Sequence, residues 1–499
     1  MVGCKMEQSV KIKNQQKISL ESIPILQKEE FLDFAEKGVN SSLRVCFMFG
    51  MDKEKLVRIF LGLADDINSI IYLTSTYFKK GESYPSLTLK HPSFNYFERE
   101  IFEEFGIEPS GHPFLKGIRF PLGQKQMNQY KFYDVNSNEI HQVAVGPVHA
   151  GVIEPGHFRF LCDGEKILHL EIQLGYQHRG IEDLFIQKDI KDKIQLAESI
   201  AGDTVIGHGY AYIQLLESLF DVETKRKTLI ERAIMLELER IAVHIGDIGA
   251  IANDVAYMLG NSVCGANRTY VINTSLSICG SRFGRGFLNI GKNNYSIDSE
   301  KRELIKKNLS KVRKNVEQLC EEMFDLSSVV SRFEGTGIVT EDDVKKCGFV
   351  GMVARSSGVK LDVRENHPFG AYKMYPIYSL FMKNGDVFSR AYLRYLEIQQ
   401  SINFIDEVLD ILDKDENHSD TKFNFKEEKN VFVVSMIEGW RGEIVHILVV
   451  DENGNKRYKV KDPSFTNWFA LALAVRGFGI SDFPLCNKSF NLSYSGNDL

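Results

Sequence analysis

The feature that most constrains the fold is one long amphipathic segment, from Lys225 to about Val255. Its apolar residues recur at steps of three to five, which is the spacing of a stripe along one helix. They are Leu229, Ala233, Leu236, Ile241, Ile245 and Ile248. The chain from about Ile181 to Ile405 is also patterned mostly as helix. We therefore predict a mainly helical unit that packs around this segment.

Strand-like patterns lie ahead of the helical unit. Leu43–Phe49 and Leu56–Leu63 have the apolar character of strands, and Asn95–Phe105 is a charged helix that ends at Gly106. Further along, Asp163-Gly164 separates two apolar runs, which is a strong hairpin signal. The sequence thus begins with a small mixed domain.

The last hundred residues return to strands and turns after a polar, charged insertion at Asp413–Lys429, which we expect to be a surface loop. The predicted fold class is α+β. A small mixed α/β domain over residues 1–125 is followed by a linker over 126–140 and a mainly helical domain with peripheral β-hairpins over 141–499.

Composition narrows the function classes. Of 499 residues, 43% are hydrophobic and 26% are charged, which is typical of a globular protein. The net charge of −6 gives no basic footprint for nucleic acid. The N-terminus lacks the apolar run of a secretory signal, and no apolar run approaches the roughly 20 residues of a membrane span.

The eight cysteines are scattered, and no two are spaced as CxxC. We therefore expect no local iron–sulfur or zinc module carried by this chain alone. Reduced, mostly buried thiols in a cytosolic compartment are the expected state.

The N-terminal domain carries a distinctive run at about residues 85–121. Glu98-Arg99-Glu100 opens a helix, and Gly111-His112-Pro113 follows in a loop. Acids at a helix start suit an exposed helix face. The whole run resembles the signature of the 30 kDa subunit of respiratory complex I, a structural subunit without a cofactor. It departs from that pattern where Glu104 replaces a residue that is usually apolar.

Five ordered motifs follow: GPVHAGVIEPGHFRF, DGEKILHLEIQLGYQHRGIE, ELERIAVHIGDIG, GSRFGRGF and GDVFSRAYLRYLEIQQS. Together they resemble the large subunit of [NiFe] hydrogenases, above all the membrane-bound, energy-converting group, and the homologous 49 kDa subunit of complex I. The resemblance runs from about His141 to Leu499 and implies the fold of those subunits.

An active [NiFe] site in that family needs four thiolates, because nickel and iron bind soft sulfur ligands there. The resemblance places Ala201, Thr204, Ser464 and Asn467 at the four cysteine positions. It therefore implies a hydrogenase-like fold without a metal bound by this chain. A hydrogenase with replacement ligands is the least favoured option.

In the 49 kDa subunit the corresponding cavity takes a quinone headgroup. The resemblance implies His157 as the histidine that contacts the quinone, with His149 as second choice. The tyrosine of that site falls at or near Gly202, which has no side-chain proton. Tyr176, Tyr210 and Tyr212 remain open as replacements.

Other candidates line the implied cavity. Glu182 stands where the hydrogenases keep a proton relay, and His208 is the histidine retained from the first cysteine motif. His178, Arg355 and Asp362 match positions that line or support the cavity. The long helix also carries Glu237, Arg240, His244, Asp247 and Asp254, of which Arg240, His244 and Asp247 share a face. These charges form either a structural ion network or a coupling path.

The resemblance implies a subunit of a membrane-associated, complex I-like oxidoreductase, peripheral on the cytoplasmic face of the membrane. An iron–sulfur small subunit with a [4Fe–4S] cluster would deliver electrons to a quinone or another small acceptor. Antiporter-like and membrane-anchor subunits would translocate ions. The alternative is a non-catalytic structural or coupling subunit of the same complex.

Overall fold

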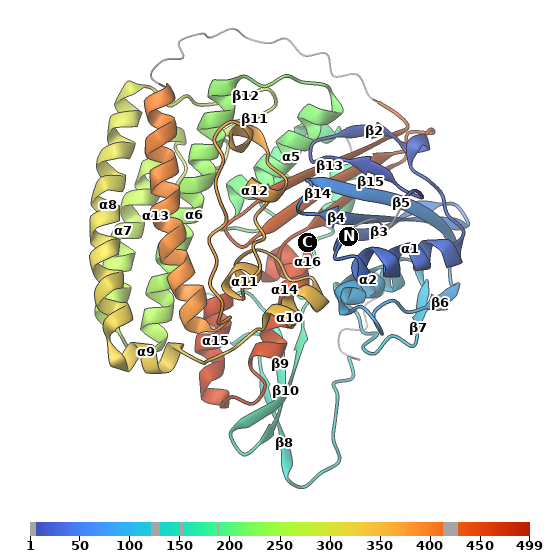
Figure 1. The fold of residues 1–499 in the computed structure, drawn as a ribbon, viewed down its shortest axis with the longest axis horizontal. Helices are drawn as coiled ribbons and strands as arrows, with labels where there is room; N and C mark the ends of the chain where they lie inside the picture. Colours follow the sequence, from blue (N-terminus) through green and yellow to red (C-terminus); the bar gives the residue numbers. More distant parts are fainter. Residues whose placement is uncertain (1–5, 121–129, 150–152, 188, 413–427) are drawn as a thin grey trace.

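The computed structural model describes residues 6–120, 130–149, 153–187, 189–412 and 428–499. The architecture is mixed α and β, with helices gathered on one side and the N-terminal sheet on the other (Figure 1). The predicted α+β class is confirmed.

The N-terminal part is a four-stranded sheet in the order β1-β5-β4-β3, with helices α1 and α2 packed beside it. The strands are β1 (Val10–Ile12), β3 (Arg44–Lys53), β4 (Leu56–Asp65) and β5 (Ile70–Lys79), with α1 at Lys28–Asn40. Two short parallel strands, β6 (Ser83–Pro85) and β7 (Glu108–Ser110), flank α2 (Asn95–Phe105). Both strands predicted in this region are present, so the expectation of a mixed module is confirmed.

Helix α2 ends as predicted, because Gly106 takes the left-handed conformation, at φ +69°. Its first turn is buried, however. Glu98, Arg99 and Glu100 are at most 5% exposed, so the expected exposed face is wrong. Glu98 accepts hydrogen bonds from the Leu87 and Thr88 backbone N–H groups, which offsets the cost of burying it.

The predicted hairpin is β9 (His157–Asp163) and β10 (Lys166–Gln173), which turns at Gly164 with φ +56°. Strand β8 (Ile140–Val145) adds to β9, so the sheet order is β10-β9-β8. This sheet extends away from the rest of the molecule in Figure 1.

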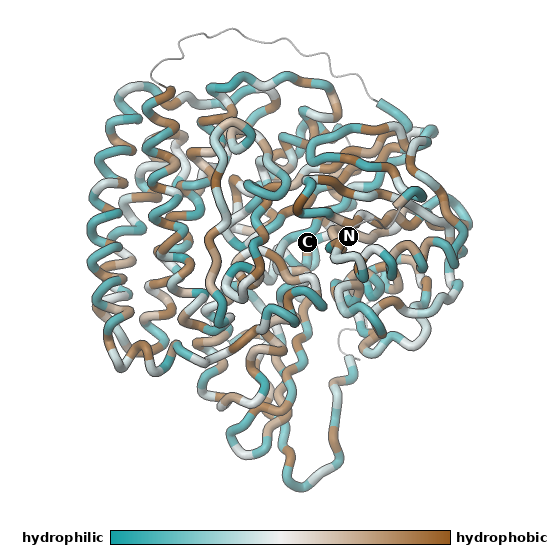
Figure 2. The backbone as a smooth tube through the Cα atoms, viewed as in Figure 1, coloured by the Kyte–Doolittle hydropathy of each residue, from teal (hydrophilic) through white to brown (hydrophobic). Residues whose placement is uncertain are grey.

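The predicted long helix is α6 (Arg226–Asp254). It packs with α7 (Met258–Cys279), α8 (Ser299–Asp325) and α13 (Val387–Leu412) in the bundle on the left of Figure 1. The outermost helix, α8, is mainly hydrophilic in Figure 2, as its charged sequence requires, while α6 is buried over most of its length.

Shorter elements connect the bundle to the rest of the fold. They are α3 (Ile181–Ile186), α4 (Ile194–Ala197), α5 (Val205–Leu219), β11 (Leu288–Asn289), β12 (Lys292–Asn293), α9 (Ser327–Phe333), α10 (Glu341–Cys347), α11 (Gly351–Ser356), α12 (Val363–Asn366) and 3-10 turns at Leu20–Ser22, Pro92–Phe94, Ile190–Asp192, Gly370–Lys373 and Ile480–Asp482.

The second large sheet has the order β15-β14-β13-β2. Strands β13 (Val431–Glu438) and β14 (Glu443–Val450) are buried at every residue, so this hairpin is central and not peripheral. Strand β15 (Lys456–Lys461) pairs with β14. The fourth strand, β2 (Lys17–Ser19), comes from the N-terminal end of the chain.

The end of the chain is more helical than its pattern predicts. After β15 come α14 (Ser464–Ala474), α15 (Phe483–Phe490) and α16 (Tyr494–Asp498). A short apolar run fits a buried strand and a buried helix equally well, which explains the difference. Of the predicted surface loop at Asp413–Lys429, residues 413–427 lie outside the described residues.

Helix α14 joins the two parts of the molecule. Its Phe465 belongs to the N-terminal core, and its ring centroid lies 5.4 Å from those of Tyr96 and Phe97. The same helix carries Ser464 and Asn467. Two of the four positions that the sequence resemblance assigns to the hydrogenase cysteines, the cysteine-equivalent positions, therefore lie beside this junction.

Candidate functional site

The first two cysteine-equivalent positions are buried just before α5. Ala201 is fully buried. The Thr204 hydroxyl lies 3.1 Å from an Asp203 oxygen and accepts a hydrogen bond of the same length from Arg441. Arg441 also binds both oxygens of Asp203, at 2.6 and 2.7 Å. The threonine is thus held by an ion pair within the chain.

The other two positions lie on α14. The Ser464 hydroxyl accepts a hydrogen bond from the Ser493 backbone N–H at 2.9 Å. The Asn467 amide accepts from the Val350 N–H and donates to the Val350 carbonyl oxygen, both at 3.0 Å. Each polar side chain at these positions has a partner in the protein itself.

This donor set does not fit a nickel–iron centre. The four positions offer a methyl group, two hydroxyls and an amide, where the resembled hydrogenases need thiolates. Within the described ranges no group of three or more His, Cys, Asp or Glu residues is placed to hold a metal ion. The seven cysteines in those ranges are free and buried.

His208 lies beside these positions in a buried polar chain. Its Nε2 is 3.0 Å from Asp462, and its Nδ1 is 3.1 Å from Nε2 of His446. His446 in turn lies 2.8 Å from the hydroxyl of Tyr458. Burial and the neighbouring His208 hold the pKa of His446 well below its usual value. His446 is therefore neutral, and the chain links a carboxylate to a phenol through two imidazoles.

Glu182 takes part in a separate ion cluster. It accepts from Lys459 at 2.9 Å and from the Val460 N–H at 3.0 Å, and it pairs with Arg457 at 3.2 Å. Burial alone would raise the pKa of Glu182, but these cations and Arg119 lower it to about 2. Glu182 is therefore an ionised carboxylate.

The cluster continues into the N-terminal part through α2. Lys459 also donates to Glu100 at 2.5 Å, and Arg457 binds both oxygens of Glu104, at 2.7 and 2.8 Å. The unusual acid at position 104 is thus explained by a cation on β15. Glu182 and His178 line the same cavity, of about 250 Å³, beside these groups. His178 itself contacts the Asp498 carbonyl oxygen at 2.7 Å through Nδ1.

His157 and His149 lie at the start of β9 and in the loop before it. The His157 ring is 4.8 Å from Phe132, and its Nε2 accepts from Arg159 at 3.3 Å. The His149 ring lies 5.7 Å from Phe158. Burial lowers the pKa of both histidines. In the described part of the chain, the buried Nε2 of His149 has no hydrogen-bond partner.

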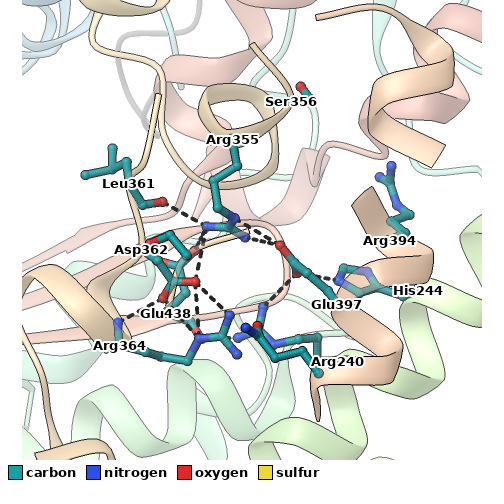
Figure 3. A network of polar contacts seen from close by, with 12 residues as sticks. Arg240, His244, Arg355, Ser356, Leu361, Asp362, Arg364, Arg394, Glu397 and Glu438 are labelled. Carbon is teal, nitrogen blue, oxygen red and sulfur yellow. Dashed lines mark hydrogen bonds and ion pairs between the residues drawn. The ribbon is translucent and has the colours of Figure 1, made fainter. Parts of the chain in front are cut away.

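Arg355 and Asp362 belong to a third group, a fully buried ion network between α6, α11, α13 and β13 (Figure 3). Arg355 pairs with Glu397 at 2.9 Å and Glu438 at 2.6 Å, and it lies 3.7 Å from Asp362. His244 binds Glu397 at 2.9 Å.

The two carboxylates that share Arg355, those of Glu397 and Glu438, differ in the direction of their pKa shifts. Burial opposes ionisation of Glu397, but Arg355 and His244 hold its pKa well below the usual value. Burial and the neighbouring Asp362 raise the pKa of Glu438 to about 7. Arg364 connects the network to Glu237 at 3.0 Å. The charged face predicted for the long helix is therefore paired throughout this region, as buried charges require.

The structure thus places the candidate residues in separate groups of contacts and not around one cavity. His208 lies with Asp462, Glu182 with Lys459, and Arg355 with Asp362, whereas His157 and His149 belong to the β8–β9 region. Sequence reasoning missed His446, Glu397 and Lys459. The signal for His446 was a single polar residue inside the apolar run EIVHILVV.

Each of the two modules is matched by a family model of a complex I subunit. The family model described as the respiratory-chain NADH dehydrogenase 30 Kd subunit matches residues 27–136, and that of the 49 Kd subunit matches residues 254–498. The chain therefore joins two regions that are similar to these two complex I subunits, the 30 Kd region before the 49 Kd region.

The relatives are named as subunits of hydrogenases and related enzymes. Hydrogenase-4 component G of Escherichia coli is 27% identical over 83% of this chain and 76% of its own length. Formate hydrogenlyase subunit 5 of the same organism is 25% identical over 93% of this chain and 83% of its own length. The membrane-bound hydrogenase subunit alpha of Pyrococcus furiosus is 25% identical over 72% and 87%.

A solved structure shows the same fold. A chain of the membrane-bound sulfane sulfur reductase, an archaeal respiratory membrane complex, aligns with a TM-score of 0.66 at 19% identity. The alignment covers 74% of this chain and all of that one. Among the helices of the described residues, none is long and apolar enough to cross a membrane.

Proposed function

We propose that this chain is the large subunit of a membrane-associated, complex I-like oxidoreductase and that it has no hydrogenase activity. The observation that carries the proposal is the set of contacts at the four cysteine-equivalent positions. Thr204, Ser464 and Asn467 are each hydrogen-bonded within the chain, and Ala201 is fully buried. These side chains replace the thiolates that a nickel–iron centre needs.

In this proposal a [4Fe–4S] cluster in an iron–sulfur small subunit delivers electrons to a quinone or another small acceptor. Two features of the loop before β9 support contact with such partners. Val148 is 79% exposed and Ile153 is 39% exposed. His149, next to Val148 in the sequence, has a buried Nε2 atom without a hydrogen-bond partner among the described residues. Exposed apolar side chains close in sequence to a buried polar group without a partner suit a partner surface.

The complex would lie at the cytoplasmic face of the membrane, with antiporter-like and membrane-anchor subunits that translocate ions. The names of the relatives support a membrane complex, since one is a membrane-bound hydrogenase subunit and others are NADH-quinone oxidoreductase subunits. The chain itself would be peripheral.

A second candidate, a non-catalytic coupling subunit, is favoured by a different observation. Around the former metal position Thr204, Val205, Ile206 and His208 are at most 2% exposed. The buried ion network around Arg355 and Glu397 could transmit a change in charge between α6 and α13. In that case turnover would not depend on the histidines of the loop.

Two measurements on the purified complex test these proposals. Metal analysis should find no stoichiometric nickel with this chain; one nickel per chain would overturn the first proposal. Replacing His157 and His149 with asparagine should reduce turnover if the loop meets the acceptor. His141→Asn, an exposed residue on β8, is the matched control. Unchanged turnover in the double variant would favour the coupling role.

A further inference from the structure

A second cavity, of about 300 Å³, lies at the junction of the two modules and is separate from the candidate residues discussed so far. Helix α2 and the loop after it form one wall, and β10, α14 and Asn497 form the other. Its size is at the lower end of the range for small-molecule sites.

Aromatic rings form much of the wall. They come from Tyr96, Phe114, Trp468 and Phe469. The Trp468 ring is fixed in place, because its Nε1 donates to the Ser493 carbonyl oxygen at 3.3 Å and the ring packs against Tyr494 at 4.8 Å. Such a wall favours a flat aromatic ligand, which gains both buried apolar area and ring contacts.

The charge of the lining favours an anion. Arg99 and Arg476 line the cavity with Glu171, and Glu171 is already paired with Lys116. Arg99 donates to the carbonyl oxygens of Lys116 and Gly117, which holds its guanidinium against the Tyr96 and Phe114 rings at 5.1 Å. Arg476 is exposed at the cavity and is available to an anionic group.

We propose that this cavity binds an aromatic anion. The ring lies against the aromatic side chains of the wall, and the negative charge lies near Arg476. The proposal does not depend on the oxidoreductase role, because none of the residues proposed for that role lines the cavity.

The test uses the full chain and two fluorescent probes of similar shape. 8-Anilinonaphthalene-1-sulfonate has an aromatic N–H and an anionic group, and N-phenyl-1-naphthylamine has the N–H alone. We expect one sulfonate probe per chain, with energy transfer from Trp468. Trp468 lines the cavity and Trp440 does not, so Trp468→Phe should reduce that transfer far more than Trp440→Phe.

Variants locate the binding site. Arg476→Gln should weaken the sulfonate probe about fivefold, the effect of one exposed charge pair, and leave the neutral probe unchanged. Lys166→Gln, at an exposed position of the β9–β10 hairpin, should change neither. Ala472→Leu, which fills the cavity from α14, should block both probes.

Three results would overturn the proposal: no stoichiometric binding, energy transfer that Trp468→Phe reduces no more than Trp440→Phe does, or equal effects of Arg476→Gln on the two probes. The last result is measured with Arg476→Gln, a substitution at an exposed position. It therefore does not depend on how well Ala472→Leu folds.

Discussion

The side-chain amide of Asn467 is bound at both ends by the backbone of Val350, which donates to its oxygen and accepts from its nitrogen at 3.0 Å each. A residue that the sequence resemblance assigns to a metal-binding cysteine position therefore links α14 to the segment before α11. A cysteine could make neither bond with comparable strength.

Asn467→Ala should lower the free energy of unfolding by about 2–3 kcal/mol, because it leaves a buried N–H and a buried C=O unpaired. Urea unfolding of the full chain measures the change. Thr466→Val is the matched control, since the buried Thr466 hydroxyl has no partner within the described part of the chain. Its effect should stay within about 0.5 kcal/mol. Equal losses for the two variants would contradict the structural role of Asn467.

Removing the Arg355 charge should be more damaging. Arg355→Met leaves Glu397 and Glu438 buried without their shared cation, and a broken buried pair costs about 3–5 kcal/mol. Arg332→Met breaks the exposed pair with Asp482 and should cost less than about 1 kcal/mol. Thermal unfolding at pH 7 compares them. A small effect of Arg355→Met would mean that the network is not buried in solution.

The lowered pKa of Glu182 predicts that the difference in stability between wild type and Glu182→Gln depends on pH. Its folded pKa, about 2, lies below its ordinary value of 4.5, so the folded state favours the ionised form. The stabilisation is complete above about pH 4.5 and is lost as the pH falls towards 2. Glu182→Gln should therefore cost about 3 kcal/mol at pH 7 and progressively less below pH 4.5.

Denaturant unfolding of wild type and Glu182→Gln across this pH range measures the effect. Glu29→Gln, on the exposed face of α1, should shift stability by no more than about 0.5 kcal/mol throughout. A difference between wild type and Glu182→Gln that grows as the pH falls would have the wrong sign for a paired carboxylate.

The buried thiols should resist labelling in the folded protein. Burial raises the pKa of Cys46 and Cys264 to about 12, and both side chains are at most 1% exposed. Because the thiolate is the reactive form, a disulfide reagent should label neither until the chain is unfolded. Peptide mass spectrometry assigns the sites, and Ser481→Cys supplies an exposed thiol that should react at once. Rapid native labelling of Cys264 would contradict its burial under α6.

Periodic and terminal signals predicted the elements well. The stripe of α6, the glycine that ends α2 and the Asp163-Gly164 turn each depend on neighbouring residues only, and all three appear where the sequence indicates. Helix α14 shows the limit of this reasoning. Its apolar run has no helical or strand period to read, and only its packing between two cores makes it a helix.

The site was harder to predict, because its contacts join distant residues. His208 meets His446 across 238 positions, and Glu182 meets Lys459 across 277. No local pattern signals either pair. The acid at position 104 looked like a departure from the family pattern, and its partner Arg457 lies 353 positions away.

Strand β2 has a consequence for how the protein is made. Ser19 pairs with Val431, so this sheet edge joins segments about 400 residues apart. During synthesis the first module leaves the ribosome long before β13 is made. Until then the backbone groups of β2 that pair with β13 have no partner strand. Completion of the sheet is therefore one of the last steps of folding, and a chain that stops short of residue 431 leaves this edge open.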